Sequence, residues 1–137
     1  MQAVIDSIVS GFPVLIIHFL VTVTMLAIGV SIYTLLTPYK EIELIREGNL
    51  AAAISKSGAV VGLGIPLAVC LATSVSTIDI VFWGVISLLI QIVCYRVADL
   101  VLKDLPQRIV AGEVGPALWL VSVKLSVAII NAAAIAG

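Results

Sequence analysis

Four long apolar stretches fill almost the whole chain, and each is long enough to cross a lipid bilayer. A transmembrane helix needs roughly 20 consecutive apolar residues, and the stretches cover about Phe12–Leu36, Leu50–Thr73, Ile78–Leu102 and Val114–Ala136. Charged residues make up 11% of the sequence and apolar residues 62%, whereas soluble domains have about 25% and about 45–50%. The sequence therefore predicts an all-α membrane protein with four transmembrane helices in one domain, residues 1–137.

The first stretch is predicted to remain as a membrane span and not to be removed as a signal peptide. Asp6 is the only charged side chain before it, so the basic segment of a signal peptide is missing. Its apolar run is also longer than the roughly 7–15 residues typical of such peptides. The net charge of −1 gives no reason to expect nucleic-acid binding.

The basic residues of the loops predict how the chain is oriented. They lie in or beside the first and third loops (Lys40, Arg46, Arg96, Lys103, Arg108), and the second loop and both termini have none. Loops rich in Lys and Arg stay in the cytoplasm. We therefore expect a multi-pass protein of the inner membrane whose two termini both face the periplasm.

The second half of the chain resembles the first when the sequence is shifted by 64 residues. Ile45 then falls on Ile109, Gly48 on Gly112 and Ala53 on Ala117, and the loops coincide. Because each half contains an even number of spans, both halves have the same orientation, unlike the inverted repeats of many transporters. The pattern predicts a parallel tandem repeat of a two-helix unit, residues 12–73 and 78–136. Since four helices bury limited surface, we also expect a homo-oligomer.

Small residues at helical spacing predict close helix contacts in the second and fourth stretches. Small side chains four residues apart allow helix backbones to approach closely. The candidates are Gly58 and Gly62, followed by Gly64 and Pro66, and the milder pair Ser122 and Ser126. Helix packing is the favoured interpretation, and a functional hinge at Pro66 is the alternative.

Several polar residues lie within the predicted spans. His18 is a candidate functional residue that shares one helix face with Thr22, Met25 and Gly29. We interpret it as a hydrogen-bonded interface residue, and a proton relay or metal ligand is the less favoured alternative. No second histidine, paired cysteine or carboxylate lies near it in sequence, so neither a metal nor another cofactor is predicted. Gln91 and Asn131 are each expected to form a hydrogen bond to another helix.

Two lysines, Lys56 and Lys124, lie inside spans and need an explanation. Lys56 is near enough to one end to extend its ammonium group to the headgroups. Lys124 lies about 15 Å from the start of its helix, and a charge there costs about 3 kcal/mol to insert. Counting along each helix places no Asp or Glu at that depth. Lys124 is therefore expected to be neutral, wetted by a cavity, bound to carbonyl groups or Gln91, or paired outside this chain.

The chain resembles the bacterial inner-membrane family called Domain of Unknown Function 350, the YjfL-type or UPF0719 family. The resemblance is most specific in the first loop, from Thr37-Pro38-Tyr39-Lys40-Glu41 to the run Ile45–Ala53, and extends over nearly the whole chain. Its loop residues are Glu41, Arg46, Glu47, Gly48, Asn49 and Arg108. Gly115-Pro116 departs from the Asn-Ala-Ala run expected in the second copy. The family implies a duplicated two-span unit and no particular reaction.

The favoured function is a structural or interaction component that forms a homo-oligomer or a complex with other membrane proteins. The alternative is a small oligomeric channel or transporter for an ion or anionic solute that uses Lys124 and Lys56. An enzyme is not expected, because intramembrane catalysis needs a nucleophile placed beside a base. Ser122 and Ser126 resemble a serine–lysine dyad with Lys124 only in composition.

Overall fold

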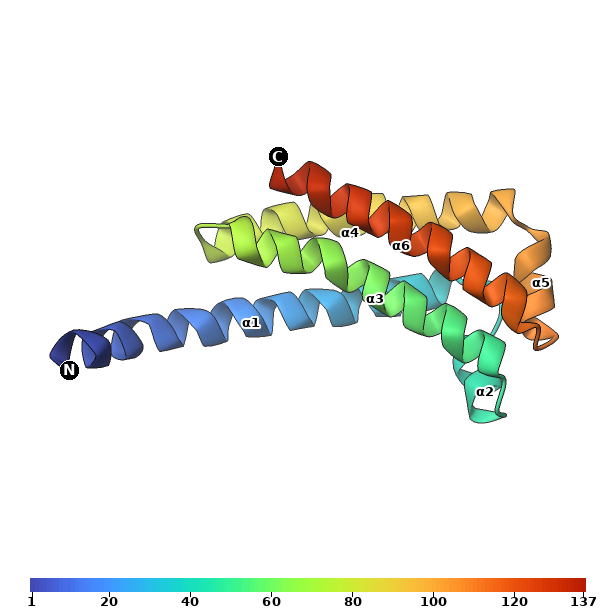
Figure 1. The fold of residues 1–137 in the computed structure, drawn as a ribbon, viewed down its shortest axis with the longest axis horizontal. Helices are drawn as coiled ribbons and strands as arrows, with labels where there is room; N and C mark the ends of the chain where they lie inside the picture. Colours follow the sequence, from blue (N-terminus) through green and yellow to red (C-terminus); the bar gives the residue numbers. More distant parts are fainter.

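Every regular element of the computed structural model, which describes residues 1–137, is a helix (Figure 1). The four long helices are α1 (Gln2–Leu36), α3 (Leu50–Thr73), α4 (Thr77–Val101) and α6 (Val114–Ala136). The short helices α2 (Glu41–Arg46) and α5 (Asp104–Val110) lie in the first and third loops. All four long helices have the length and apolar composition of membrane spans. The predicted all-α fold with four helices able to span a membrane is therefore confirmed.

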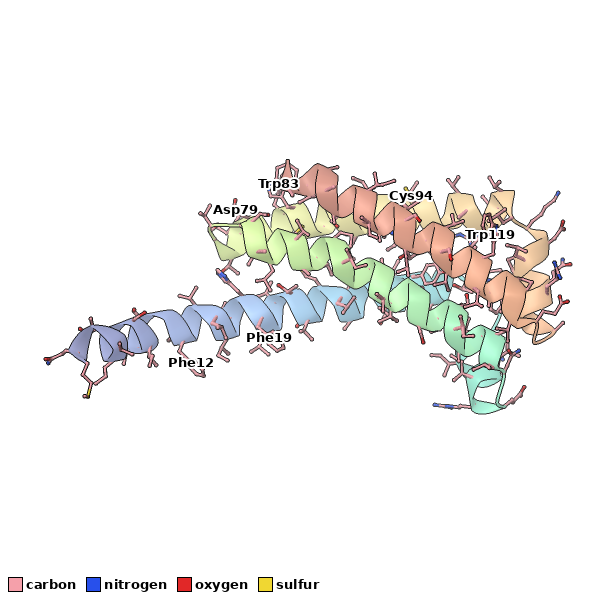
Figure 2. The ribbon with its side chains drawn as sticks, viewed as in Figure 1. Phe12, Phe19, Asp79, Trp83, Cys94 and Trp119 are labelled. Atoms are coloured by element: carbon pink, nitrogen blue, oxygen red, sulfur yellow. The ribbon has the colours of Figure 1, made fainter.

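Helix α1 is longer than its apolar stretch predicted. It begins at Gln2 instead of Phe12 and has 35 residues, which corresponds to about 52 Å against a hydrocarbon thickness of about 30 Å. Pro13 lies inside α1 without ending it. The buried residues of α1 begin only at Thr22. The N-terminal half, which carries Phe12 and Phe19, diverges from the other helices (Figures 1 and 2).

Helices α3 and α6 form the most extensive helix contact of the fold, and Gly58 of α3 lies at this contact. A Cβ atom on Gly58 would lie 2.5 Å from Val121 Cγ2 of α6. A Cβ atom on Gly62 would overlap the hydroxyl group of Tyr95, which belongs to α4. Side chains at either position would push the helices apart, so both glycines lie at close contacts, as expected.

The other four packing candidates differ in their surroundings. A Cβ atom on Gly64 would lie 3.9 Å from Leu26 of α1, an ordinary contact distance. Pro66 is buried, and α3 continues past it to Thr73. Ser122 and Ser126 are exposed, and their hydroxyl groups donate to the carbonyls of Leu118 and Ser122 in their own helix. The two serines therefore take no part in helix packing within the chain, contrary to the prediction, because they lie on the outer face of α6.

The first and third loops lie together at one end of the bundle. Asn49 begins α3 by accepting a hydrogen bond from the Ala52 N–H, and its amide donates to the carbonyls of Ile109 and Val110 in the other loop. Each loop turns into its next helix at a glycine, Gly48 or Gly112, with φ of 89° in both cases. We call this end of the molecule the α2/α5 end.

Candidate functional site

A buried ion pair joins α4 to α6. The Lys124 side chain is 1% exposed, and its Nζ lies 3.0 Å from Oδ1 of Asp99. Arg96 Nη1 lies 3.8 Å from the other oxygen of the same carboxylate. The expectation that no carboxylate reaches the depth of Lys124 is therefore wrong. Asp99 of α4 is the counter-ion of Lys124.

Distances along each helix from its own end do not give the relative depths of Asp99 and Lys124. Asp99 lies two residues before the last residue of α4, and Lys124 lies ten residues after the first residue of α6. That count compares the two helices only if their ends lie at one level and their axes are parallel. In Figure 1 the two axes are inclined to each other. The inclination and the long lysine side chain bring the two charges together.

A second buried ion pair joins α2 to α3. Lys56 Nζ lies 3.3 Å from Oε2 of Glu41, and the exposed fractions of the two side chains are 12% and 1%. The same ammonium group donates to the Thr34 hydroxyl of α1. Lys56 was expected to extend to the headgroups, but α2 folds over α3 and brings a carboxylate to it instead.

Tyr33 of α1 lies between the two lysines and connects the ion pairs. Lys124 donates a hydrogen bond to the Tyr33 hydroxyl. The ammonium nitrogens of Lys124 and Lys56 lie 4.8 Å and 5.7 Å from the centre of the Tyr33 ring, within the range of a cation–π contact. Tyr95 of α4 completes the group, with its ring centre 5.1 Å from Lys124 Nζ and 5.4 Å from the Tyr33 ring.

We define the charge network as the two ion pairs with their connecting residues: Glu41, Lys56, Tyr33, Lys124, Asp99 and Arg96. Neither Tyr33 nor Asp99 was among the residues predicted for a site. A signal for Tyr33 was present, because it continues the face of Thr22, Met25 and Gly29 by four residues. For Glu41, which the family loop did include, nothing in the sequence indicated burial.

Buried amides extend the polar interior from Lys124 toward the opposite end. Gln91 donates to the Lys124 carbonyl at 3.4 Å. Asn131 donates to Gln91 Oε1 at 3.1 Å and to the Ser87 carbonyl at 3.2 Å. These bonds connect α4 to α6, so the prediction that Gln91 and Asn131 bond to another helix is confirmed. His18 is half-buried on α1 and apart from this group, and its carbonyl accepts from Thr22.

The remaining loop residues lie outside the charge network. Arg108 binds Glu113 through two hydrogen bonds of 2.6 Å and 3.3 Å at the surface. This bonding lowers the pKa of the Glu113 carboxyl and raises the pKa of Arg108. Arg46 and Glu47 are exposed on the corresponding turn of the first half.

A cavity of about 370 Å³ opens at the α2/α5 end and leads to the charge network. Its polar lining residues are Tyr39, Arg96, Asp99, Lys103 and Gln107, and two prolines and a leucine complete it. Burial, and then the nearby Glu41 carboxylate, raises the pKa of the Tyr39 phenol. Tyr39 is therefore a neutral hydroxyl at neutral pH. We call this cavity the α2/α5 pocket.

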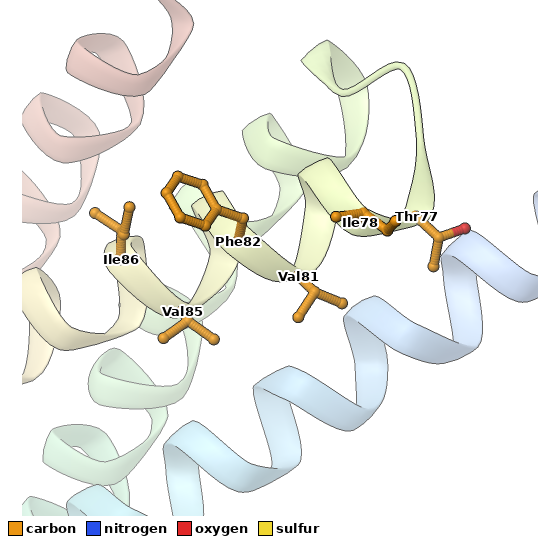
Figure 3. A pocket seen from close by; sticks show the side chains of 6 residues that line it. All are labelled: Thr77, Ile78, Val81, Phe82, Val85 and Ile86. Atoms are coloured by element: carbon orange, nitrogen blue, oxygen red, sulfur yellow. The ribbon is translucent and has the colours of Figure 1, made fainter.

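Two larger cavities are apolar and lie on the outer surfaces of α4. One, of about 500 Å³, is lined by Thr77, Ile78, Val81, Phe82, Val85 and Ile86 near α1 (Figure 3). The other, of about 460 Å³, lies between α4 and α6 and is lined only by hydrophobic residues. Such surfaces suit lipid chains or apolar helices, and neither cavity is lined by a charged residue.

Comparison with known proteins identifies the family. The family described as Domain of Unknown Function (DUF350) matches residues 7–135. The chain belongs to this family. It is also 32% identical to the UPF0719 inner membrane protein YjfL of Escherichia coli K12 over 116 residues, which cover 85% of this chain and 88% of that protein. YjfL of Escherichia coli O157:H7 matches with the same identity and coverage. No solved structure matches the chain.

These matches, together with the four apolar helices, make this DUF350 member an inner-membrane protein that spans the bilayer several times. The resemblance noted in the sequence is thereby confirmed, and it covers both ion pairs.

Proposed function

We propose that this DUF350 protein is a structural or interaction component of the inner membrane that works as a homo-oligomer, with α1 as the contact between copies. The observation that carries the proposal is the unpartnered half of α1. No residue before Thr22 is buried, although this helix is longer than a bilayer requires. Leu20 is 56% exposed, and Ile16 is 37% exposed.

We also propose that the two halves of the chain form a tandem repeat. A comparison of the halves then indicates which helix of a second copy packs against the exposed half of α1. The glycines of the two turns have the same φ, and their N–H groups bond to Ile45 and Ile109, 64 residues apart. In such a repeat, α1 corresponds to α4 and α3 corresponds to α6. Helix α4 contacts α3, whereas α1 makes no comparable contact with α6. A contact equivalent to that of α4 with α3 can therefore form between α1 of one copy and α6 of another.

The charge network supports a contact of this apolar kind. Both lysines find their counter-ions inside one chain, so neither lysine needs a neighbouring copy to neutralise it. Association would then depend on van der Waals packing of apolar and small side chains, as is usual between membrane helices. The basic residues of the α2/α5 end support a cytoplasmic location for that end and a periplasmic location for both termini.

Cysteine cross-linking tests the contact. By the 64-residue shift, Leu20 of α1 corresponds to Gly84 of α4, where an added Cβ atom would lie 3.3 Å from Leu67 of α3. By the same shift, Ala134 of α6 corresponds to Cys70, which is buried on α3. With Cys70 and Cys94 replaced by alanine, Leu20→Cys combined with Ala134→Cys should form a cross-linked dimer in native membranes.

A matched control replaces Ala134→Cys by Phe82→Cys, since Phe82 of α4 is 59% exposed in the same half of the bundle. This pair should give little cross-linking. If both pairs cross-link with equal yield and native mass measurement in mild detergent detects only the monomer, α1 is not an interface.

The second candidate is a small transporter for an ion or an anionic solute. The α2/α5 pocket favours it, because Asp99 both lines this pocket and pairs with Lys124. A flux assay in liposomes compares the native protein with Lys124→Leu and Lys56→Leu. Flux that both substitutions leave unchanged would eliminate a transport mechanism based on these lysines.

A further inference from the structure

The charge network contains more positive than negative charge. Its cations are Lys56, Lys124 and Arg96, and its anions are the carboxylates of Glu41 and Asp99. One positive charge therefore remains unbalanced in a setting where charges are normally paired. Arg96 is the most accessible of the three cations, with a side chain that is 32% exposed. The excess charge is thus located where the network meets the α2/α5 pocket.

The α2/α5 pocket adds further groups suited to an anion. Lys103 lines it as a second cation, and Tyr39 and Gln107 contribute a hydroxyl and an amide that can donate hydrogen bonds. Arginine and lysine together are typical partners of phosphate groups. The carboxylate of Asp99 does not cancel this preference, because Lys124 already neutralises it from the interior at 3.0 Å.

We infer that the α2/α5 pocket is a binding site for a phosphate group, held between Arg96 and Lys103. The pocket lies where the spans end and the loops begin, the level at which phospholipid headgroups lie, and basic pockets between membrane helices bind anionic headgroups. An anionic phospholipid and a free phosphate ester share this chemistry. The site does not depend on the proposed oligomer, since every lining residue belongs to one chain.

Native mass spectrometry of the full-length protein in mild detergent tests the site. The probes are phosphatidylglycerol and phosphatidylcholine with identical acyl chains, so that only headgroup charge differs. We expect preferential binding of phosphatidylglycerol, reduced about fivefold by Arg96→Gln and by Lys103→Gln, as one basic residue contributes about 1 kcal/mol near an anionic surface. Arg46→Gln is the matched control, because Arg46 is an exposed cation at the same end outside the pocket.

A competition with millimolar inorganic phosphate distinguishes the two sources. If phosphate displaces phosphatidylglycerol and itself binds with the same dependence on Arg96 and Lys103, the site takes a free phosphate ester. If phosphate has no effect, the lipid is the ligand. Equal binding of both lipids, or an equal loss in Arg46→Gln, would overturn the proposal. Lys103 is exposed, so its variant keeps the fold and the test stands even if Arg96→Gln misfolds.

Discussion

The ion pair between Lys124 and Asp99 makes the sharpest prediction about stability. At an N–O distance of 3.0 Å, two unit charges attract each other by about 5–6 kcal/mol at an effective dielectric constant of about 20. Desolvation offsets much of this attraction, but removal of one partner leaves a buried charge unpaired and costs about 3–5 kcal/mol. Asp99→Asn should therefore lower the free energy of unfolding by about 3 kcal/mol, since it strands Lys124 at 1% exposure.

A double-mutant cycle separates the ion pair from the other contacts of the two residues. The variants are Asp99→Asn, Lys124→Met and the combination, and their unfolding is followed by circular dichroism during titration with SDS in mixed micelles. The double variant should be less destabilised than the sum of the single variants by about 2 kcal/mol, because it leaves no stranded charge.

The exposed pair Arg108–Glu113 supplies the control cycle. It has good geometry, but water screens it, and its coupling should be much smaller than that of the buried pair in the same titration. Free energies for Asp99→Asn and Lys124→Met that add to within about 0.5 kcal/mol would refute the view that these residues form a coupled pair in the membrane.

Three further predictions use the same unfolding assay. Gly62→Ala should destabilise by about 1–3 kcal/mol because a Cβ would overlap the Tyr95 hydroxyl, whereas Gly115→Ala, with nothing within 4 Å, should be neutral or stabilising; equal effects would contradict close packing at Gly62. Gly48→Ala should lower the free energy of unfolding by about 1–2 kcal/mol because φ is 89° there. Any loss of stability in the comparison variant Ala51→Gly would have a different cause. The pKa of Glu113 is lowered from 4.5 in the folded protein. Its stabilisation is therefore present above pH 4.5 and lost as the pH falls through the lowered pKa. The stability difference between native protein and Glu113→Gln should disappear in acid, and a difference that grew in acid would reverse the assignment.

Much of the fold could be predicted from the pattern of apolar residues. The predicted limits of the second and fourth stretches agree with α3 and α6, because polar residues such as Asn49 and Glu113 stand directly before each helix. The start of α1 was missed by ten residues. Membrane insertion requires an apolar run, but a helix continues as long as no residue ends it, and polar side chains such as Asp6 and Ser10 do not.

The candidate site was predicted only in part. The sequence indicated that Lys56 and Lys124 needed partners, but not which ones, because partner choice depends on how helices tilt and on how a short loop helix folds back. Glu41 illustrates this difficulty. It belongs to a loop that reads as solvent-exposed, yet α2 brings its side chain to 1% exposure beside Lys56.

Each ion pair closes within its own half of the chain, and this has a consequence for biogenesis. Glu41 of the first loop and Lys56 are 15 residues apart, and Asp99 and Lys124, on either side of the third loop, are 25 residues apart. A helical hairpin emerging from the translocation machinery can therefore enter the bilayer with its lysine already neutralised. Neither half has to wait for the other to be synthesised before its charge is accommodated. The contacts of Tyr33 with both lysines would then form in a later step, when the two hairpins pack together.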